Sequence, residues 1–318
     1  MTEEKWAWEL RMFCSADIVG STAYKSGNSI KSGSSWAATF SEFFRSFPEE
    51  LQNSYAKLPA KYEDSTNQLT PWKFSGDEIL FSVPISRHQE GISHLWAFKD
   101  AVKRFPEENW QKKDLPLGLK ATGWIAGFPV TNRKVRIQQS NTVDYLGPAI
   151  DLGFRVSKFA TTTKFVLSAD LALLILHGYE TCEPASSDML KLFLDSKQAL
   201  KGVINGVPYP IIYCDMNDGI STEEEILLGL VPIDNPDLLK KYLRTFLEST
   251  PNLIKPFIKN DENPKYGTLP DEIVNLREQM MAEESDRNYL NQSHLPEPQV
   301  EGAARQPNQP SIEPPDTN

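Results

Sequence analysis

Residues 12–22, Met-Phe-Cys-Ser-Ala-Asp-Ile-Val-Gly-Ser-Thr, contain the pattern that decides the fold of this chain. The apolar run over 12–19 predicts a buried β-strand with one carboxylate, Asp17, near its end. The turn that follows, where we expect a helix to begin, contains Gly20, Ser21 and Thr22. A carboxylate at a strand end suits a divalent cation, and the backbone N–H groups after the glycine suit phosphate oxygens. Capping of the next helix is an equally good explanation of Asp17.

Strand and helix patterns alternate around this first strand, from about residue 8 to residue 218. Residues 29–58 carry bulky apolar side chains at helical spacing, and residues 94–105 form an amphipathic helix that we expect Pro106 to end. Two short strands within 72–83 are expected to flank a tight turn at 75–77. Residues 117–127 alternate as a strand, and 148–160 are expected to be helical.

The remainder of this region continues the alternation. A strand over 164–169, a helix through Leu176 and a strand over 191–195 come before a hairpin that turns at Asn205-Gly206. The order β-α-β-β-α-β, with an added helix and strands, predicts an α+β fold of the ferredoxin-like type. We expect helices to cover one face of its sheet.

The composition argues against several kinds of partner and bound group, namely nucleic acid, structural zinc and membrane. Lys and Arg total 33 and Asp and Glu total 43, so the net charge of −10 excludes a large basic face for sequence-independent nucleic-acid binding. Three isolated cysteines predict neither a disulfide framework nor a zinc site. Because the N-terminus lacks a signal-peptide core and no apolar run approaches roughly 18 residues, we expect a cytoplasmic protein without a membrane partner.

Three further segments carry polar residues that suit the same binding of metal and phosphate as residues 12–22. Asp77, in the 75–77 turn, would lie beside the end of the first strand if the two strands are neighbours. Two Asp residues on adjacent strands are a common support for a pair of Mg²⁺ ions, although turn geometry alone also explains a Gly-Asp turn. Asp151 and Arg155 share one helix face, where an exposed ion pair is the simpler interpretation. Lys201, in the last hairpin, is by itself an ordinary solvated lysine.

Together these segments resemble the class III nucleotidyl cyclases, in outline over residues 12–215. The first metal-binding motif of that family corresponds to residues 17–22, and the second corresponds to Asp77, with the base-recognising Lys four residues earlier at Lys73. The family then has an Asp seven residues before an Asn and eleven before an Arg. Asp144 and Arg155 match that spacing, Asp151 stands at the Asn position, and Lys201 is similar to the family's triphosphate-contacting Lys.

The resemblance implies conversion of a nucleoside triphosphate to its 3′,5′-cyclic monophosphate and pyrophosphate. Two Mg²⁺ or Mn²⁺ ions per active site would be held by Asp17, Asp77 and the Ile18 carbonyl, beside Ser21 and Thr22. Arg155 would bind the charge that develops on the α-phosphoryl oxygens. In the family each site lies at a dimer interface, so a homodimer is implied, with one subunit supplying the metal ligands and the other supplying Lys73, Asp144, Asp151, Arg155 and Lys201.

The choice of nucleotide depends on two features that favour different bases. The resemblance implies that Lys73 and Asp144 favour ATP, because adenylate-forming members of the family use a Lys–Asp pair on the base. The Asp would accept from an exocyclic amine, which adenine and cytosine carry and uracil lacks, and uracil would use the Lys through its O4 acceptor. Residues 20–25 and 151–155, and the compact form, resemble the bacterial pyrimidine cyclases of Pycsar antiphage defence. Those enzymes make cyclic UMP or cyclic CMP, which activates a separate effector protein. We therefore rank UTP before CTP before ATP.

Two other functions fit parts of the sequence. Residues 75–79 are similar to the G-G-D-E-F motif of diguanylate cyclases, but that hypothesis leaves Asp144, Asp151 and Arg155 unexplained. A catalytically silent nucleotide sensor would be indicated by loss of a metal-binding Asp or of the Arg, and all are present. We therefore divide the chain into a catalytic domain (1–218), a helical extension (219–294) and a Pro-rich tail (295–318) that we expect to be disordered.

Overall fold

The computed structural model describes residues 6–27, 35–59, 62, 67–137, 142–182, 190–216, 236–251 and 253–293. The chain divides into two compact units, Met1–Val274 and Asn275–Asn318. Residues 219–235 of the predicted helical extension and the predicted tail over 295–318 lie outside the described residues. The domain boundary at residue 218 also lies outside them, and it stays a prediction.

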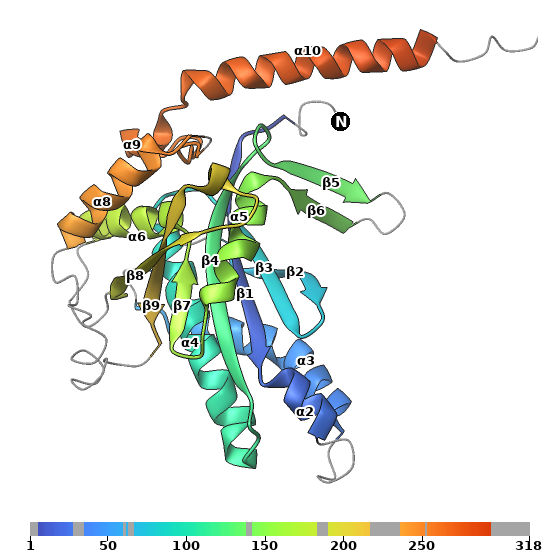
Figure 1. Ribbon diagram of the computed structural model, residues 1–318, viewed down its shortest axis with the longest axis vertical. Helices are drawn as coiled ribbons and strands as arrows, with labels where there is room; N and C mark the ends of the chain where they lie inside the picture. The colour runs from blue at the N-terminus through green and yellow to red at the C-terminus, as the bar shows by residue number, and fades with distance from the viewer. Residues whose placement is uncertain are drawn as a thin grey trace, which may run out of the picture. The chain divides into compact units, whose positions relative to one another are not determined.

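A seven-stranded sheet forms the centre of the first unit, in the order β2-β3-β1-β4-β7-β9-β8 (Figure 1). Neighbouring strands are antiparallel except β4 and β7, which are parallel. The strands are β1 (Glu9–Val19), β2 (Thr70–Ser75), β3 (Glu78–Ile85), β4 (Gly118–Phe128), β7 (Lys164–Leu167), β8 (Leu192–Ala199) and β9 (Pro208–Asp215). With helices between β1 and β2 and between β3 and β4, the first four strands have the predicted βαββαβ order. The α+β fold class is confirmed.

One face of the sheet is covered by helices α3 (Trp36–Tyr55), α4 (Glu90–Asn109) and α6 (Ala169–Cys182), as predicted. Successive residues of a strand point to opposite faces, and on β1 the alternate residues that enter this core are Met12, Cys14, Ala16 and Ile18. A short helix, α2 (Ser21–Gly27), follows β1 directly. The residues that alternate with these along β1 therefore point to the opposite face of the sheet.

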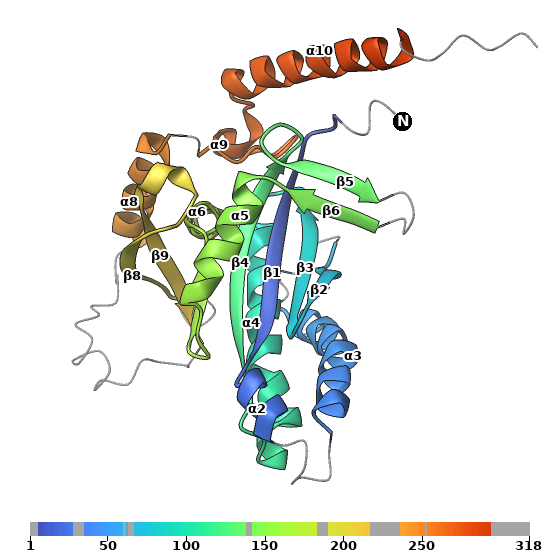
Figure 2. The ribbon, with the colours of Figure 1, turned by 45° about the vertical axis from the view of Figure 1, so that its right-hand side comes forward.

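The opposite face carries a second, smaller apolar cluster, which the sequence does not predict. Helix α5 (Pro148–Val156) and a two-stranded sheet of β5 (Arg133–Ile137) and β6 (Thr142–Leu146) lie on this side, and Figure 2 shows α4 and α5 on opposite sides of β4. A Cβ atom on Gly153 would lie 2.4 Å from the Trp124 ring, so only glycine lets α5 approach this closely. The cluster contains Phe13, Leu80, Trp124, Ala126, Phe128, Tyr145 and Ile150.

Two predicted boundaries are wrong. Pro106 lies inside α4, which starts at Glu90 and runs to Asn109. A proline removes one backbone hydrogen bond, and burial of Val102 and Phe105 before it and of Trp110 at the end of the helix offsets that loss. The last hairpin is not a two-residue turn, because β8 ends at Ala199 and residues 200–207 connect it to β9.

The helices predicted after the sheet are confirmed where the structure describes them. Helix α8 (Pro236–Ser249) packs on α6 and adds Leu239, Leu243 and Phe246 to the core of the first unit. A short helix α9 (Pro264–Gly267) and a long helix α10 (Asp271–Ser293) follow. Among the described helices, none has the length and apolar character needed to span a membrane.

Candidate active site

Asp17 and Asp77 lie at the ends of neighbouring strands, as predicted. Asp17, in β1, is paired across the sheet with Glu78, the first residue of β3. Asp77 comes directly before that residue, and its carbonyl accepts a hydrogen bond from the Ile18 N–H at 3.3 Å. Gly76 turns the chain between β2 and β3 with φ of +67°, in the left-handed region that favours glycine. The turn therefore fixes Asp77 against the end of β1.

A row of charged side chains crosses three strands at this position. Glu78 on β3, Asp17 on β1 and Lys120 on β4 lie directly opposite one another. Lys120 Nζ lies 2.8 Å from Asp17 Oδ2. The two-residue alternation places all three on the face that carries the second apolar cluster. The prediction missed Glu78 and Lys120 because sequence does not reveal which residues face each other across strands.

The carboxylates of Glu78 and Asp17, with that of Asp77 nearby, concentrate negative charge at a partly buried position. Burial raises the pKa of Asp17, and the charge of Asp77 raises it further, while the Lys120 ammonium acts in the opposite direction. Burial and the charges of Asp17 and Asp77 also raise the pKa of Glu78. A cation bound here would offset this repulsion.

The carboxylate oxygens of Asp17 and Asp77 suit a hard divalent cation whose other ligands come from phosphate and water. Within the described ranges, no group of three or more His, Cys, Asp or Glu side chains could hold a metal ion alone. Mg²⁺ is ordinarily bound through one or two carboxylates, and waters and substrate phosphates complete its shell. The Asp17 and Asp77 carboxylates supply those ligands, and oxygen donors suit Mg²⁺ or Mn²⁺.

Residues Ser21 and Thr22 begin α2 directly beyond this strand end. Gly20 adopts φ of +86°, and a Cβ atom there would lie 2.8 Å from the Pro116 carbonyl oxygen. The first helical hydrogen bond runs from the Tyr24 N–H to the Gly20 carbonyl at 3.0 Å. Ser21 is buried and Thr22 is exposed, so only the second of these predicted nucleotide contacts has an accessible side chain.

Lys73 and Asp144, 71 positions apart, form an ion pair in which Nζ lies 3.0 Å from Oδ2. Lys73 comes from β2 and Asp144 from β6. The neighbouring Trp72 Nε1 donates to the Val143 carbonyl at 3.2 Å, and the Trp72 and Tyr145 rings meet edge to face at 5.1 Å. Two hairpins that are distant in sequence thus hold this pair together at the surface.

Asp151 and Arg155 lie on α5 without pairing with each other. Asp151 is exposed in the first turn, and the structure records no ion pair between the two side chains, so the simple i,i+4 salt bridge is not formed. Arg155 is half-buried, and its Nε is buried without a hydrogen-bond partner in the described part of the chain. A buried guanidinium donor without an acceptor is costly unless an anion binds it.

Lys201 is exposed in the 200–207 connection. None of the interactions recorded for the described residues joins it to the other predicted site residues. The structure thus gathers the carboxylate row, the Lys73–Asp144 pair and α5 on one side of the sheet, and gives no such association for Lys201.

No protein-family model matches the sequence, and no curated protein matches it. The chain is similar to solved structures of cyclases. The adenylyl cyclase CyaB from P. aeruginosa is 15% identical, with a TM-score of 0.45, and the alignment covers 66% of this chain and 95% of that one. The guanylyl cyclase Cya2 is 13% identical with a TM-score of 0.44, covering 66% and 93%. A Trypanosoma brucei adenylate cyclase is 12% identical with a TM-score of 0.41, covering 64% and 89%.

Similarities at such low identities and TM-scores do not show which reaction this chain catalyses. What this chain can do follows from its own side chains. Asp17 and Asp77 can share a divalent cation with phosphate, Arg155 can donate to an anion, and the Lys73–Asp144 pair can hydrogen-bond a polar ring edge.

Proposed function

We propose that this protein is a class III nucleotidyl cyclase that converts a pyrimidine nucleoside triphosphate to its 3′,5′-cyclic monophosphate and pyrophosphate. The observation that carries the proposal is the gathering of motifs distant in sequence on one side of the sheet. Asp17 and Asp77 suit metal-bound phosphate, Lys73 with Asp144 suits a base, and Arg155 suits a phosphoryl group.

In this proposal Asp17, Asp77 and the Ile18 carbonyl hold two Mg²⁺ or Mn²⁺ ions. Bound there, the ions supply charge neutralisation on the triphosphate and a lower pKa for the ribose 3′-OH. The half-buried guanidinium of Arg155 donates toward the α-phosphoryl oxygens, where negative charge increases during the reaction. Asp151, at the position where the family has a ribose-orienting Asn, orients the ribose. Thr22 and Lys201 contact the triphosphate through their side chains, and the buried Ser21 does so through its backbone N–H.

The preferred substrate is UTP, followed by CTP. Lys73 can donate to O4 of uracil, whereas Asp144 accepts from the exocyclic amine of cytosine or adenine. The pair therefore also supports an alternative, an adenylate cyclase that makes cyclic AMP. The ranking of UTP first rests on the resemblance of residues 20–25 and 151–155 to the Pycsar enzymes. The same resemblance supports a cytoplasmic second-messenger synthase in antiphage defence, with a separate effector protein.

The test is turnover of each of the four nucleoside triphosphates by the purified full chain with Mn²⁺. We expect pyrophosphate and a single cyclic mononucleotide, cyclic UMP, identified by mass spectrometry. Asp17→Ala and Arg155→Ala should each abolish turnover, while Lys158→Ala, which removes an exposed charge just after α5, should not. No turnover with any nucleotide would favour the silent sensor, and a cyclic or linear dinucleotide would favour the diguanylate type.

A homodimer with shared sites makes a sharper prediction. If Asp17 and Arg155 act from different subunits, a mixed dimer of the two inactive variants contains one intact site. Random mixing should then restore about one quarter of the wild-type rate, because half of the dimers are mixed and each has one site of two. Activity absent after verified subunit exchange would contradict the shared site.

A further inference from the structure

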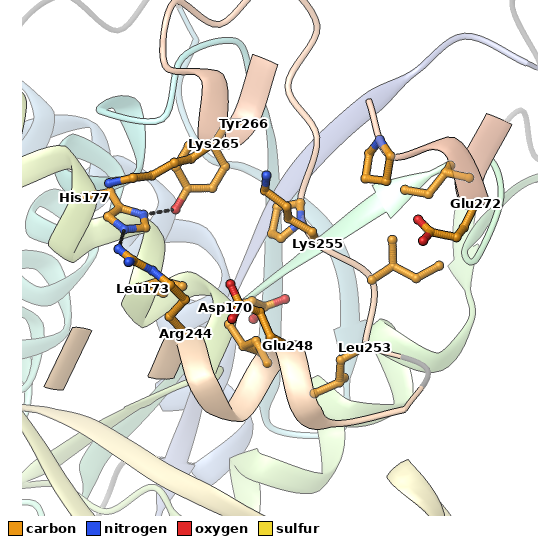
Figure 3. Close-up of a pocket in the computed structure, with 15 residues that line it drawn as sticks. Asp170, Leu173, His177, Arg244, Glu248, Leu253, Lys255, Lys265, Tyr266 and Glu272 are labelled. Atoms are coloured by element: carbon orange, nitrogen blue, oxygen red, sulfur yellow. Dashed lines mark hydrogen bonds between the residues drawn. The ribbon is translucent and has the colours of Figure 1, made fainter. Parts of the chain in front are cut away.

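A cavity of about 660 Å³ lies in the first unit between α6, α8 and the chain from 253 to 273 (Figure 3). None of the residues proposed for the cyclase reaction lines it. Its volume is in the range of pockets for small molecules, which are about 300–1,000 Å³. Apolar walls come from each of the three segments, including Leu173, Leu247, Leu253, Ile254, Pro256, Pro270 and Ile273.

Apart from the half-buried Lys265, which pairs with Glu180, the polar and charged residues of the cavity divide into an inner and an outer set. Asp170, on the first turn of α6, is half-buried, and the other inner polar residues, His177 and Tyr266, are buried. The outer set is exposed and mixed in sign. It contains Arg244, Glu248, Lys255 and Glu272.

Asp170 lacks a cationic partner within the described residues. Its Oδ1 accepts hydrogen bonds from the Ser168 hydroxyl and from the Leu171 N–H, the latter at 2.9 Å. Among the residues that the structure describes, no hydrogen bond to its Oδ2 and no ion pair to Asp170 is recorded. Burial raises the pKa of Asp170 to about 6, so at neutral pH most molecules carry a charge, which the described residues offset by hydrogen bonds from Ser168, Leu171 and the Asp170 backbone but not by a cation.

The neighbouring ring groups do not supply the missing positive charge. Burial, with the charge of Lys265, lowers the pKa of His177 to about 4, so this ring is neutral at pH 7. Arg244 donates to His177 Nε2 at 3.5 Å, which leaves the ring hydrogen on Nδ1 to donate to the Tyr266 hydroxyl at 2.8 Å (Figure 3). Lys265 itself pairs with Glu180 at 3.1 Å.

We propose that this cavity binds a small aliphatic amine, whose primary ammonium pairs with Asp170. The methylene chain of the amine would lie against Leu173, Leu247 and Leu253. An ammonium satisfies a desolvated carboxylate that has a free oxygen, and the apolar walls strengthen the pairing by excluding water. This site is independent of the proposed cyclase activity.

The end of the amine that is distant from Asp170 would lie near the outer set of side chains, which includes both positive and negative charges. A second ammonium would pair with Glu248 or Glu272, whereas a carboxylate would pair with Arg244 or Lys255. The ligand is therefore either a diamine or an amino acid with a separated amine, and both share the ammonium that Asp170 recognises.

Titration calorimetry on the full chain, without nucleotide, tests this proposal. The probes are 1,5-diaminopentane, 6-aminohexanoate and, as a control without an amine, hexanoate. We expect saturable binding of at least one amine at one site per chain, and no saturable binding of hexanoate. The amine that binds more tightly shows whether a second ammonium or a carboxylate pairs with the outer set. Hexanoate binding as tightly as the amines, or saturable binding by neither amine, would overturn the proposal.

Two variants connect binding to the cavity. Asp170→Asn keeps the acceptor for Ser168 and Leu171 but removes the charge, and should weaken amine binding by about 10- to 100-fold. Asp114→Asn, at an exposed position outside the cavity, should leave it unchanged. Leu247→Trp fills the cavity from α8 and should also abolish binding, which keeps the test decisive if Asp170→Asn unfolds. Equal affinity in a folded variant of either kind would refute the site.

Discussion

The two ends of the candidate active site are built differently. Asp17 lies on β1, a central strand with hydrogen-bonded neighbours on both sides, and Asp77 is fixed against its end. Lys73 lies on the edge strand β2, and its partner Asp144 belongs to a separate two-stranded sheet. Lys73 is 47% exposed, whereas Asp17 is 25% exposed. The end proposed to bind metal (the metal end, with Asp17 and Asp77) is thus held by the core of the fold, and the end proposed to bind the base (the base end, with Lys73 and Asp144) is held by side-chain contacts at its margin.

The largest expected effect is at the metal end. Asp17→Asn removes a charge that a divalent ion requires while keeping the shape of the side chain, so we expect turnover to fall by at least about 10³-fold. The measurement is the rate of cyclic nucleotide formation, with circular dichroism to show that the fold is kept.

Asp114→Asn is the matched control, because it makes the same chemical change at an exposed turn. A loss of less than tenfold in Asp17→Asn would show that this carboxylate does not hold the catalytic ion, and the contrast between the two ends would disappear.

The next effect is at the base end, where we expect a change of preference rather than loss of chemistry. Lys73→Gln and Asp144→Asn each replace a charged hydrogen-bonding group by a neutral one, which should change the ratio of kcat/KM between UTP and the other nucleotides by about 10- to 100-fold. The measurement is competition among the four nucleotides. A uniform loss with every nucleotide would place the pair outside base recognition.

A smaller effect concerns Lys120, which occupies the position beside Asp17 where a cation is needed. Lys120→Met removes a competing ammonium, so Mn²⁺ should bind about two- to fivefold more tightly in the absence of nucleotide. Electron paramagnetic resonance of free Mn²⁺ gives the affinity. Lys158→Met changes the net charge equally at a distant exposed position, and it should leave the affinity unchanged.

The smallest effect is on stability at the base end. A double-mutant cycle on Lys73 and Asp144 should give a coupling of roughly 0.2–1 kcal/mol in the free energy of unfolding, as for other exposed ion pairs. Urea denaturation of the four proteins measures it. A coupling above about 2 kcal/mol would mean that the pair has a structural role.

The sequence predicted the features that depend on local pattern. The apolar runs identify β1 and β3 as buried, and the Gly-Asp turn brings Asp77 to the end of β1. The resemblance to the cyclase family assigned Lys73 and Asp144 to recognition of one base, and the structure pairs them, although no local pattern could reveal that pairing.

The features that were missed depend on tertiary structure. Lys120 faces Asp17 only because β4 lies beside β1 in one particular register. Strands β5 and β6 alternate polar and apolar residues, at 134–137 and 142–145, but each has only five residues, and so short a signal did not identify them. Pro106 remains inside α4 because core packing outweighs a local preference.

The independence of the β5–β6 sheet has a consequence for how this fold can diversify. Because β5 and β6 pair only with each other in the part of the chain that the structure describes, their residues can change without altering the register of the central strands. In the proposed cyclase, selection on the choice of base and selection on metal binding would then act on separable parts of one gene. A new ligand preference can arise in that hairpin by a few surface substitutions, at little risk to the chemistry that the central sheet supports.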